Sequence, residues 1–382
     1  MKIHTVKEGE TAGSIAAMYG VSPMKLAENN GISYKGELIE GEELLILLPT
    51  RTTVAGRGER LSDIAERFGV RESTLMGYNP ECAHGGELYE GEQIAVRYGT
   101  PTLGLGIGNG YFYRSCKKEQ LIRAMPYLSY LTISCAIGKR GGLTMLFDDT
   151  EIAALGRAAG KLPLLRIRLE SESAKERLES VRCAAIKAAA GGYHGLTLSG
   201  DIGEGREGES LMLEAKKLLA EFDLSLFLEC DLDCVPPAID YADGSVISYD
   251  KIHLDPIPSF DDGERMAFTR FAEEHDALRC FIDLSPFALS GTRYLTKDEA
   301  REAIRRGRGR MMKGENGAYL YGMAGRGRGQ RTYVMESMEN TEKKLELLSE
   351  CGYYGIAFDI ARTSVYDLLM FRTSFAEGIG MC

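Results

Sequence analysis

An internal repeat restricts the possible folds of this chain more than any other feature. Residues 1–50 and 51–99 align at an offset of 49 residues, which becomes 50 after a one-residue slip near the end of each copy. The identical pairs are Gly9/Gly58, Glu10/Glu59, Ile15/Ile64, Ala16/Ala65, Gly20/Gly69, Val21/Val70, Leu26/Leu75, Asn30/Asn79, Gly41/Gly91 and Glu42/Glu92. A fixed period of this length indicates one small structural unit used twice. We therefore predict two modules, residues 1–50 and 51–99.

Each copy has the pattern strand, helix, helix, strand. Residues 3–6 alternate between apolar and polar side chains, as a half-buried strand does. The run GETAGSIAAMYG begins with a polar cap and places its apolar residues on one helical face, and Gly20 ends that helix. Ser22-Pro23 begins a second helix with a cap and a fixed first turn. The apolar run ELLILLP supplies the last strand, so each module is predicted to be βααβ.

The pattern changes after residue 99 to apolar strands that alternate with amphipathic helices. Such alternation is typical of a parallel α/β fold. We predict strands near residues 102–108, 127–136, 163–170, 195–201, 224–231, 246–255, 277–285 and 354–360. Eight such units fit a (β/α)8 TIM barrel over residues 100–382. A small α+β insertion, about residues 290–337, is expected between strands seven and eight, with a hairpin in YLYGMAGRGRGQRTYVMES.

Composition excludes several classes of function. The chain has 382 residues and a formal net charge of −10, which disfavours general binding to nucleic acid or to anionic membranes. Two Arg/Gly stretches, residues 305–310 and 325–331, are interpreted as a helix end and a solvated turn. No apolar segment approaches the length of a membrane span, and no signal peptide is recognised, which predicts cytoplasmic synthesis. Nine scattered cysteines without a C-x-x-C pair predict free thiols.

The repeats resemble the LysM module. The resemblance rests on GETAGSIAAMYGV and GERLSDIAERFGV near the start of each copy, and on the later GEL runs. It implies a shallow groove that binds N-acetylglucosamine units between the first strand–helix loop and the last helix–strand loop. The implied groove residues are Gly9, Glu10, Thr11 and Ile32 with loop 36–41, and Gly58, Glu59 and Arg60 with loop 85–91. Two weak sites on one chain also gain affinity through effective concentration.

The order of the barrel segments resembles glycoside hydrolase family 18, and is closest to the branch of bacterial spore-cortex lytic N-acetylglucosaminidases. The matching runs are MPYLSYLTIS, FDDTEIAALGRAAG, AAGGYHGLTLSGD and MENTEKKLELLSECGYYGIAFD. In that family a Glu after the fourth strand protonates the glycosidic oxygen, and the substrate's own acetamido group attacks the anomeric carbon. An Asp two residues before the Glu stabilises the charged intermediate.

The matching stretch here, GYHGLTLSGD, departs from the family pattern DxxDxDxE. His194 and Thr197 replace two Asp residues, Ser199 replaces the stabilising Asp, and Asp201 replaces the Glu. A carboxyl shortened by one methylene moves back by about 1.5 Å, and a misplacement of about 1 Å can cost ~10² in rate. A neutral hydroxyl cannot balance a positive intermediate as a carboxylate does. We therefore predict that the barrel does not catalyse the family's reaction at a normal rate.

Two further family features are missing. The run HLDPIP, residues 253–258, has no Tyr where the family uses one to bind the acetamido group. Asp359 stands where the family has the Trp that lies under the reacting sugar, and the chain has no Trp at all.

Polar residues nevertheless alternate toward the ends of the predicted strands, where barrel enzymes place their sites. The candidates at this barrel mouth are Arg166, Arg168, Glu229, Asp255 and Asp359. A remodelled ligand site and a buried salt-bridge network are equally compatible with them. His194 and His253 lack metal-ligand spacing, so a hydrogen-bonding role is favoured and no metal or cofactor is expected.

Three functions follow as hypotheses. The first is a protein that binds peptidoglycan or another N-acetylglucosamine polymer at the cell wall or spore, with a catalytically impaired barrel. The second is an active N-acetylglucosaminidase that uses Asp201 as the general acid. The third is a new activity at the Arg/carboxylate mouth.

Overall fold

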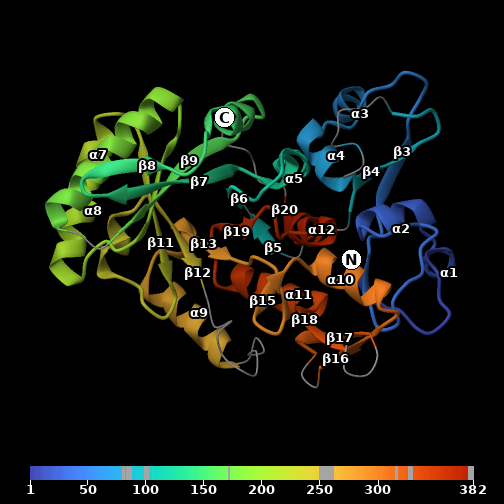
Figure 1. Cartoon of the computed structure of the whole chain (residues 1–382). Helices are drawn as coiled ribbons and strands as arrows, with labels where there is room; N and C mark the ends of the chain where they lie inside the picture. The colour runs from blue at the N-terminus through green and yellow to red at the C-terminus, as the bar shows by residue number, and fades with distance from the viewer. Residues whose placement is uncertain are drawn as a thin grey trace.

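The chain forms two small modules, a barrel and an insertion into the barrel (Figure 1). The computed structural model describes residues 1–79, 82, 88–98, 103–105, 107–170, 173–248, 262–314, 317–325 and 330–376. In Figure 1 both modules lie at one side of the barrel, next to the C-terminal helix α12 and the helix α10 of the insertion.

Both modules have the predicted βααβ order. The first contains β1 (Lys2–Thr5), α1 (Ala12–Tyr19), α2 (Pro23–Asn29) and β2 (Glu43–Ile46). The second contains β3 (Arg51–Val54), α3 (Leu61–Phe68), α4 (Glu72–Tyr78) and β4 (Gln93–Arg97). In each module the two strands pair antiparallel. Gly20 and Gly69 end the first helix of their modules at φ angles of 68° and 66°, a left-handed conformation that glycine adopts without strain.

A buried asparagine joins the second helix to the last strand in both modules. The Nδ2 of Asn30 donates to the carbonyl oxygens of Leu26 and Leu45, both at 2.9 Å, and its Oδ1 accepts from the backbone N–H of Leu45 at 2.7 Å. Asn79 makes the same three bonds to α4 and β4. Since buried backbone groups need partners, the repeated Asn is a structural requirement of the module.

Eight parallel strands close the predicted barrel, with β19 pairing back onto β6. In order around the barrel they are β6 (Ile107–Phe112), β7 (Tyr130–Lys139), β9 (Leu162–Leu169), β10 (Gly195–Gly200), β11 (Ser225–Asp231), β12 (Gly244–Ser248), β13 (Cys280–Asp283) and β19 (Gly355–Asp359). The strand β8 (Gly142–Met145) extends β7 as an antiparallel hairpin.

Helices follow most barrel strands and cover the outside. They are α5 (Lys118–Ala124), α6 (Thr150–Ala158), α7 (Ala174–Gly191), α8 (Gly205–Ala220), α9 (Asp262–Glu274), α11 (Met338–Glu350) and α12 (Val365–Ser374). Between β11 and β12 the described chain has a short 3-10 helix, η3 (Pro237–Tyr241), which begins after Pro236. Short 3-10 turns also follow α5, as η2 (Met125–Tyr127), and α9, as η5 (Ala277–Arg279).

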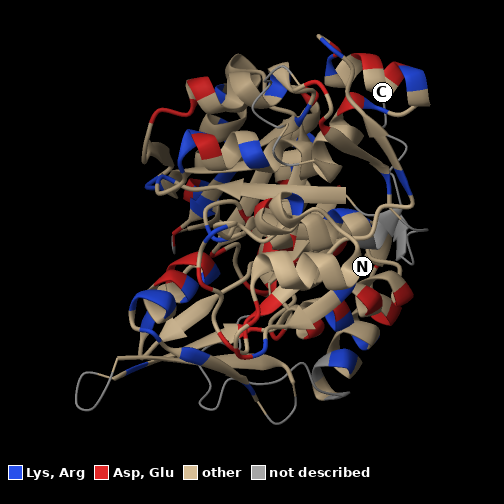
Figure 2. Ribbon diagram, turned by 90° about the vertical axis from the view of Figure 1, so that its right-hand side faces the viewer, with Lys and Arg blue, Asp and Glu red and all other residues tan. Residues whose placement is uncertain are grey.

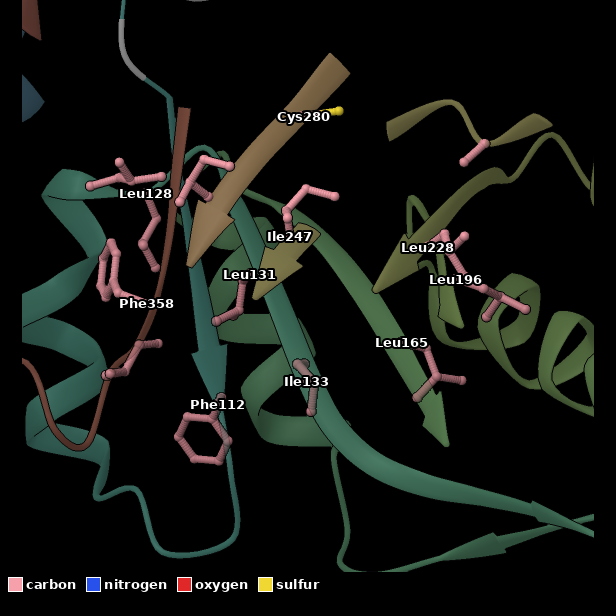
Figure 3. Packing of buried hydrophobic residues seen from close by; sticks show 14 of the residues in the cluster. Phe112, Leu128, Leu131, Ile133, Leu165, Leu196, Leu228, Ile247, Cys280 and Phe358 are labelled. Carbon is pink, nitrogen blue, oxygen red and sulfur yellow. The ribbon is translucent and has the colours of Figure 1, made fainter. Parts of the chain in front are cut away.

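The main core lies between the strands and these helices. Figure 3 shows buried side chains from successive strands, among them Leu131, Leu165, Leu196 and Leu228. The packing is close, since a Cβ placed on Gly156 of α6 would lie 2.9 Å from Leu131. A second cluster fills the barrel below its mouth with Tyr111, Tyr130, Leu164, Phe227, Val246, Phe281 and Ala357. The barrel interior is therefore packed rather than hollow.

The insertion between β13 and β19 is a five-stranded antiparallel sheet with one helix. Its elements are β14 (Ala288–Ser290), β15 (Arg293–Leu295), α10 (Lys297–Arg306), β16 (Arg310–Lys313), β17 (Tyr319–Ala324) and β18 (Arg331–Glu336), with strand order β15-β14-β18-β17-β16. The predicted hairpin is confirmed, because β17 and β18 pair from Tyr319↔Glu336 to Ala324↔Arg331.

The predicted position of the first barrel strand was wrong. We expected it near residues 102–108, but the barrel strand is Ile107–Phe112, and β5 (Leu103–Leu105) pairs with β20 (Phe375–Ala376). The true strand carries the polar Asn109 inside the barrel, where its Oδ1 accepts from Thr132 Oγ1 at 2.8 Å. A buried polar pair of this kind is not visible in the apolar pattern. The sixth strand ends at Ser248, and residues 249–261 lie outside the described residues.

Candidate functional site

The first strand–helix loop of each LysM-like module presents the residues predicted for the groove. Gly9 and Gly58 are exposed and have φ angles of 79° and 70°. Glu10 and Glu59, in contrast, fold back onto their own loops. Glu10 accepts from the backbone N–H of Lys7 at 2.8 Å, and Glu59 accepts from that of Gly56 at 2.8 Å. The carboxylates thus shape the loops, and the exposed backbone is what the loops present to a ligand.

The other predicted groove residues lie beside these loops. Thr11 caps α1, with its Oγ1 accepting from the backbone N–H of Ser14. Arg60 is exposed at the start of α3, and its backbone N–H donates to Asp63 at 2.9 Å. Ile32 is half-buried and packs against the first module's core. The structure therefore places all of them at the surface or edge of their modules.

The second loop differs sharply between the two modules. Ile39 and Tyr89 are equivalent, since the backbone N–H of each donates to the Glu three residues later, at 3.1 Å and 2.9 Å. Ile39 is 3% exposed and belongs to the core of the insertion, whereas Tyr89 is 81% exposed. The first module therefore uses this loop for a contact within the chain, whereas residues 89–91 of the second are exposed to solvent.

Several bonds fix the first module to the insertion. The backbone N–H of Met311 donates to the carbonyl oxygen of Glu40 at 2.8 Å. The Nε of Arg301 on α10 donates to Glu42 at 2.5 Å, and both side chains are buried. A Cβ on Gly41, whose φ is 81°, would overlap the carbonyl oxygen of Met311. These contacts hold the module in one orientation, because a buried ion pair is costly to separate.

The fourth barrel strand, β10, carries Thr197 and Ser199, two of the residues that the sequence analysis aligned with the family's catalytic motif. Thr197 and Ser199 point into the barrel and are buried. The Ser199 Oγ donates to the carbonyl oxygen of Ile167 at 3.4 Å. No carboxylate stands at either position, so this strand offers no charge to stabilise a positive intermediate.

Asp201, just beyond the end of this strand, is turned toward helix α7. Its Oδ1 lies 3.4 Å from Nη1 of Arg177 and accepts from the backbone N–H of Gly203 at 2.9 Å. Arg177 is buried and also pairs with Glu207 at 2.6 Å. The Asp201 carboxylate is thus held by contacts with α7 and with its own loop. Sequence reasoning did not identify Arg177, because nothing in a helical pattern marks one arginine as the partner of a strand-end acid.

An ion pair occupies the mouth beside the fourth strand. Arg166 on β9 donates to Glu229 on β11 through Nε at 2.6 Å and through Nη2 at 2.7 Å. Its Nη1 donates to Ser134 on β7 at 3.1 Å. Because Thr197 of β10 pairs with Arg166 on one side and with Phe227 of β11 on the other, the ion pair crosses over β10. Two predicted mouth residues are thus brought together.

The remaining predicted mouth residues do not join this ion pair. Arg168 is exposed and lies 3.9 Å from Glu170, away from this pair. Asp255, together with His253 and Pro258, lies outside the described residues. His194 at the opposite end of β10 lies 3.3 Å from Ser225 Oγ, and burial lowers its pKa, which favours the neutral ring. In the part of the chain that the structure describes, no group of three His, Cys, Asp or Glu side chains could hold a metal.

Ser285 forms hydrogen bonds with two acidic residues on neighbouring strands, with the side chain of one and the backbone of the other. The Ser285 Oγ donates to Asp283 at 2.6 Å and accepts from the backbone N–H of Asp359 at 2.9 Å. Burial raises the pKa of Asp283 to about 6 and raises the pKa of Asp359, and the charge of Asp359 adds to the effect on Asp283. Asp359 also pairs with Arg362 at 3.2 Å, whose guanidinium lies over Tyr294 of the insertion. The insertion therefore forms one wall of the mouth.

Two tyrosines, Tyr111 in β6 and Tyr113 just after it, lie at the mouth and were missed by sequence reasoning. Tyr111 is buried, and its hydroxyl has no hydrogen-bond partner among the described residues. Burial raises the pKa of both Tyr111 and Tyr113, with Glu229 and Asp283 adding to this effect. The alternation of Asn109, Tyr111 and Tyr113 is the sequence signal that could have identified them, but the misplaced first strand concealed it.

Comparison with known proteins agrees with this architecture. Residues 4–46 and 55–97 match the LysM domain, so the chain contains two LysM domains. It is 31% identical over 188 residues to the autolysin of Enterococcus faecalis (strain ATCC 700802 / V583), a match that covers 41% of this chain and 25% of the autolysin. The chain thus spans about a quarter of that relative.

Solved structures extend the likeness over the whole chain. The spore cortex-lytic enzyme SleL of Bacillus cereus superposes with a TM-score of 0.73 at 17% identity, covering 98% of both chains. A GH18 chitinase from Cycas revoluta, solved in complex with (GlcNAc)3, gives a TM-score of 0.58 at 12% identity, covering 70% of this chain and 99% of the chitinase. Two LysM domains followed by a barrel with the family 18 fold are therefore the architecture of this protein.

Proposed function

We propose that this protein binds peptidoglycan at the cell wall or spore surface and that its barrel does not hydrolyse glycans at a normal rate. The binding half is supported by the two LysM domains and by the likeness to an autolysin and a cortex-lytic enzyme. No helix in the described part of the chain is long and apolar enough to cross a membrane.

In this proposal the second LysM domain provides most of the glycan binding. Its Tyr89 is exposed beside the groove, and an aromatic ring can cover the apolar face of a sugar. The equivalent Ile39 of the first domain is buried in the insertion. The first domain thus acts mainly as a structural part of the barrel's surroundings.

One observation carries the catalytic half of the proposal: Asp201 is paired with the buried Arg177. A general acid must lie within hydrogen-bond reach of the leaving group, whereas the Asp201 carboxylate is turned toward Arg177 of α7 and the backbone N–H of Gly203. Two further features support an impaired barrel. Ser199 is neutral where the resembling family has a carboxylate, and the Arg166–Glu229 pair lies over β10 beside it.

An active glycosidase that uses Asp201 is the second candidate. It is favoured by the 38% exposure of the Asp201 side chain at the correct strand end. Incubating the whole protein with spore-cortex and vegetative peptidoglycan and analysing the soluble muropeptides separates the two candidates. We expect no release above that of an Asp201→Asn variant. Release by the parent protein that Asp201→Asn abolishes would establish the active enzyme instead.

A pelleting assay with purified peptidoglycan tests the binding half. Tyr89→Ala is expected to weaken binding about fivefold or more, in the range of an aromatic interface residue. The matched control is Tyr34→Ala, because Tyr34 is also an exposed tyrosine but lies on the docked first domain, and it is expected to change binding little. Failure of the parent protein to pellet with peptidoglycan would contradict the proposal.

A further inference from the structure

A groove with a volume of about 600 Å³ lies on the insertion, outside the barrel mouth. Its floor is one face of the sheet, where Arg293, Ser290 and Tyr333 follow one another across β15, β14 and β18. Its wall is α10, which contributes Glu299 and Ala303. The groove is therefore built from rigid elements rather than from loops.

Two arginines give the groove its charge. Arg293 and Arg331 are exposed, and neither has an ion pair or side-chain hydrogen bond with the described residues. Glu299 is the acidic lining residue, and it accepts from the backbone N–H of Thr296 at 2.9 Å. The lining thus carries two guanidinium groups against one carboxylate, on a protein whose formal net charge is −10. Figure 2 shows acidic and basic residues otherwise interspersed over the helices.

The same helix joins this groove to the first LysM domain. Arg301 and Arg305 of α10 point to that domain, bonding Glu42 and the carbonyl oxygen of Glu37. Glu299 and Ala303 of α10 point to the groove. The groove and the first LysM domain therefore lie on different sides of one helix.

The lining residues define a ligand class. Arginine pairs with carboxylates through two parallel N–H groups, which makes it suited to a ligand that carries carboxylates. Tyr333 is buried in the core of the insertion and closes the floor of the groove, and Ser290 provides a hydroxyl that can form a hydrogen bond with the ligand. A neutral polymer of N-acetylglucosamine would leave both guanidinium groups unpaired.

We propose that this groove binds the carboxylates of the peptides attached to the peptidoglycan strand, and so distinguishes peptidoglycan from chitin. The inference rests on the proposed function, because it assumes that the chain reaches peptidoglycan through its LysM domains. The occupant is a peptidoglycan strand whose peptide carboxylates pair with Arg293 and Arg331.

A binding comparison with the full-length protein tests the inference. The probes are peptidoglycan freed of attached phosphate polymers, the same material before that treatment, and chitin. The double variant Arg293→Gln/Arg331→Gln is compared with Arg310→Gln, which alters an exposed arginine on the opposite face of the same sheet. Thermal unfolding confirms that all variants are folded.

We expect the double variant to bind phosphate-free peptidoglycan about tenfold more weakly at low salt, with the difference shrinking as salt screens the pairs. Chitin binding and the Arg310→Gln variant should be unchanged. Equal binding of parent and double variant to peptidoglycan would overturn the inference and leave the proposed function intact. A loss seen only with phosphate polymers attached would overturn it in favour of a phosphate site, and a parent that binds no peptidoglycan would overturn both proposals.

Discussion

Arg166 and Glu229 lie on alternate strands of the barrel, and their two hydrogen bonds pass over the strand between them. That middle strand, β10, carries the buried and uncharged Thr197 and Ser199. The charges at this part of the mouth thus lie on the two strands that flank β10. The pair has the geometry of a structural bridge, since both charges are mutually satisfied.

Removing one partner of this bridge should destabilise the protein. Glu229→Gln leaves the Arg166 guanidinium half-buried without its counter-charge, and we expect a loss of about 2–3 kcal/mol in the free energy of unfolding. Denaturant titration measures it. Glu151→Gln, which breaks the exposed pair with Lys118, is the control and should cost less than about 1 kcal/mol. Equal effects of the two substitutions would refute a structural role for the bridge.

Asp283 should make stability depend on pH. Its pKa is raised to about 6 in the folded protein, first by burial, whereas an unfolded Asp ionises near pH 3.9. The folded state therefore retains the proton more strongly, so its contribution is complete below about pH 4 and is lost as the pH rises through about 6. We expect Asp283→Asn to be about 2 kcal/mol more stable than the parent near pH 7.5 and nearly equal near pH 4.

Chemical unfolding at several pH values checks this prediction. Asp233→Asn, which changes an exposed carboxyl on the same rim, is the matched control and should give no such difference. A constant gap between Asp283→Asn and the parent from pH 4 to 7.5 would argue against the titration of Asp283.

The two LysM domains offer a matched pair of glycines. Gly41 and Gly91 are equivalent and have φ angles of 81° and 90°, but only at Gly41 would a Cβ meet the insertion. Gly91→Ala should cost about 1–2 kcal/mol through backbone strain alone. Gly41→Ala should cost more and should also release the first domain, which limited proteolysis between residues 30 and 50 would detect. Similar proteolysis of both variants would show that the domain is not held by this contact.

The buried asparagines should be required for each LysM domain. Asn79→Ala leaves the backbone groups of Leu75 and Ala95 without partners, and we expect a loss of about 2–4 kcal/mol. Hydrogen exchange of the β4 amides would show the effect locally. Gln93→Ala, an exposed change on the same strand, serves as the control, and comparable exchange in both variants would contradict this role.

Much of the architecture follows from sequence pattern alone. The offset of 49 residues predicts two copies of one module, and the equivalent Asn30 and Asn79 make the same hydrogen bonds to the last strand in both. Six of the eight barrel strands lie within a few residues of the predicted ranges, because apolar runs of this length mark strands that are buried between the helices and the barrel interior. The sixth strand agrees at its start, and the rest of its predicted range lies outside the described residues. The altered motif at Ser199 and Asp201 is a prediction from the sequence, and the structure adds that Ser199 is buried and that Asp201 contacts Arg177.

Other features depend on contacts between residues that are distant in sequence. Ile39 and Tyr89 occupy equivalent positions, and only the docking of the insertion decides that one is buried and the other exposed. Arg177 lies 24 residues before Asp201, on a helix whose pattern does not indicate which strand-end acid it meets. Local sequence determines which elements form, since that depends on neighbouring side chains and backbone propensity. Packing in three dimensions decides which carboxylate pairs with a cation and which loop residue remains exposed.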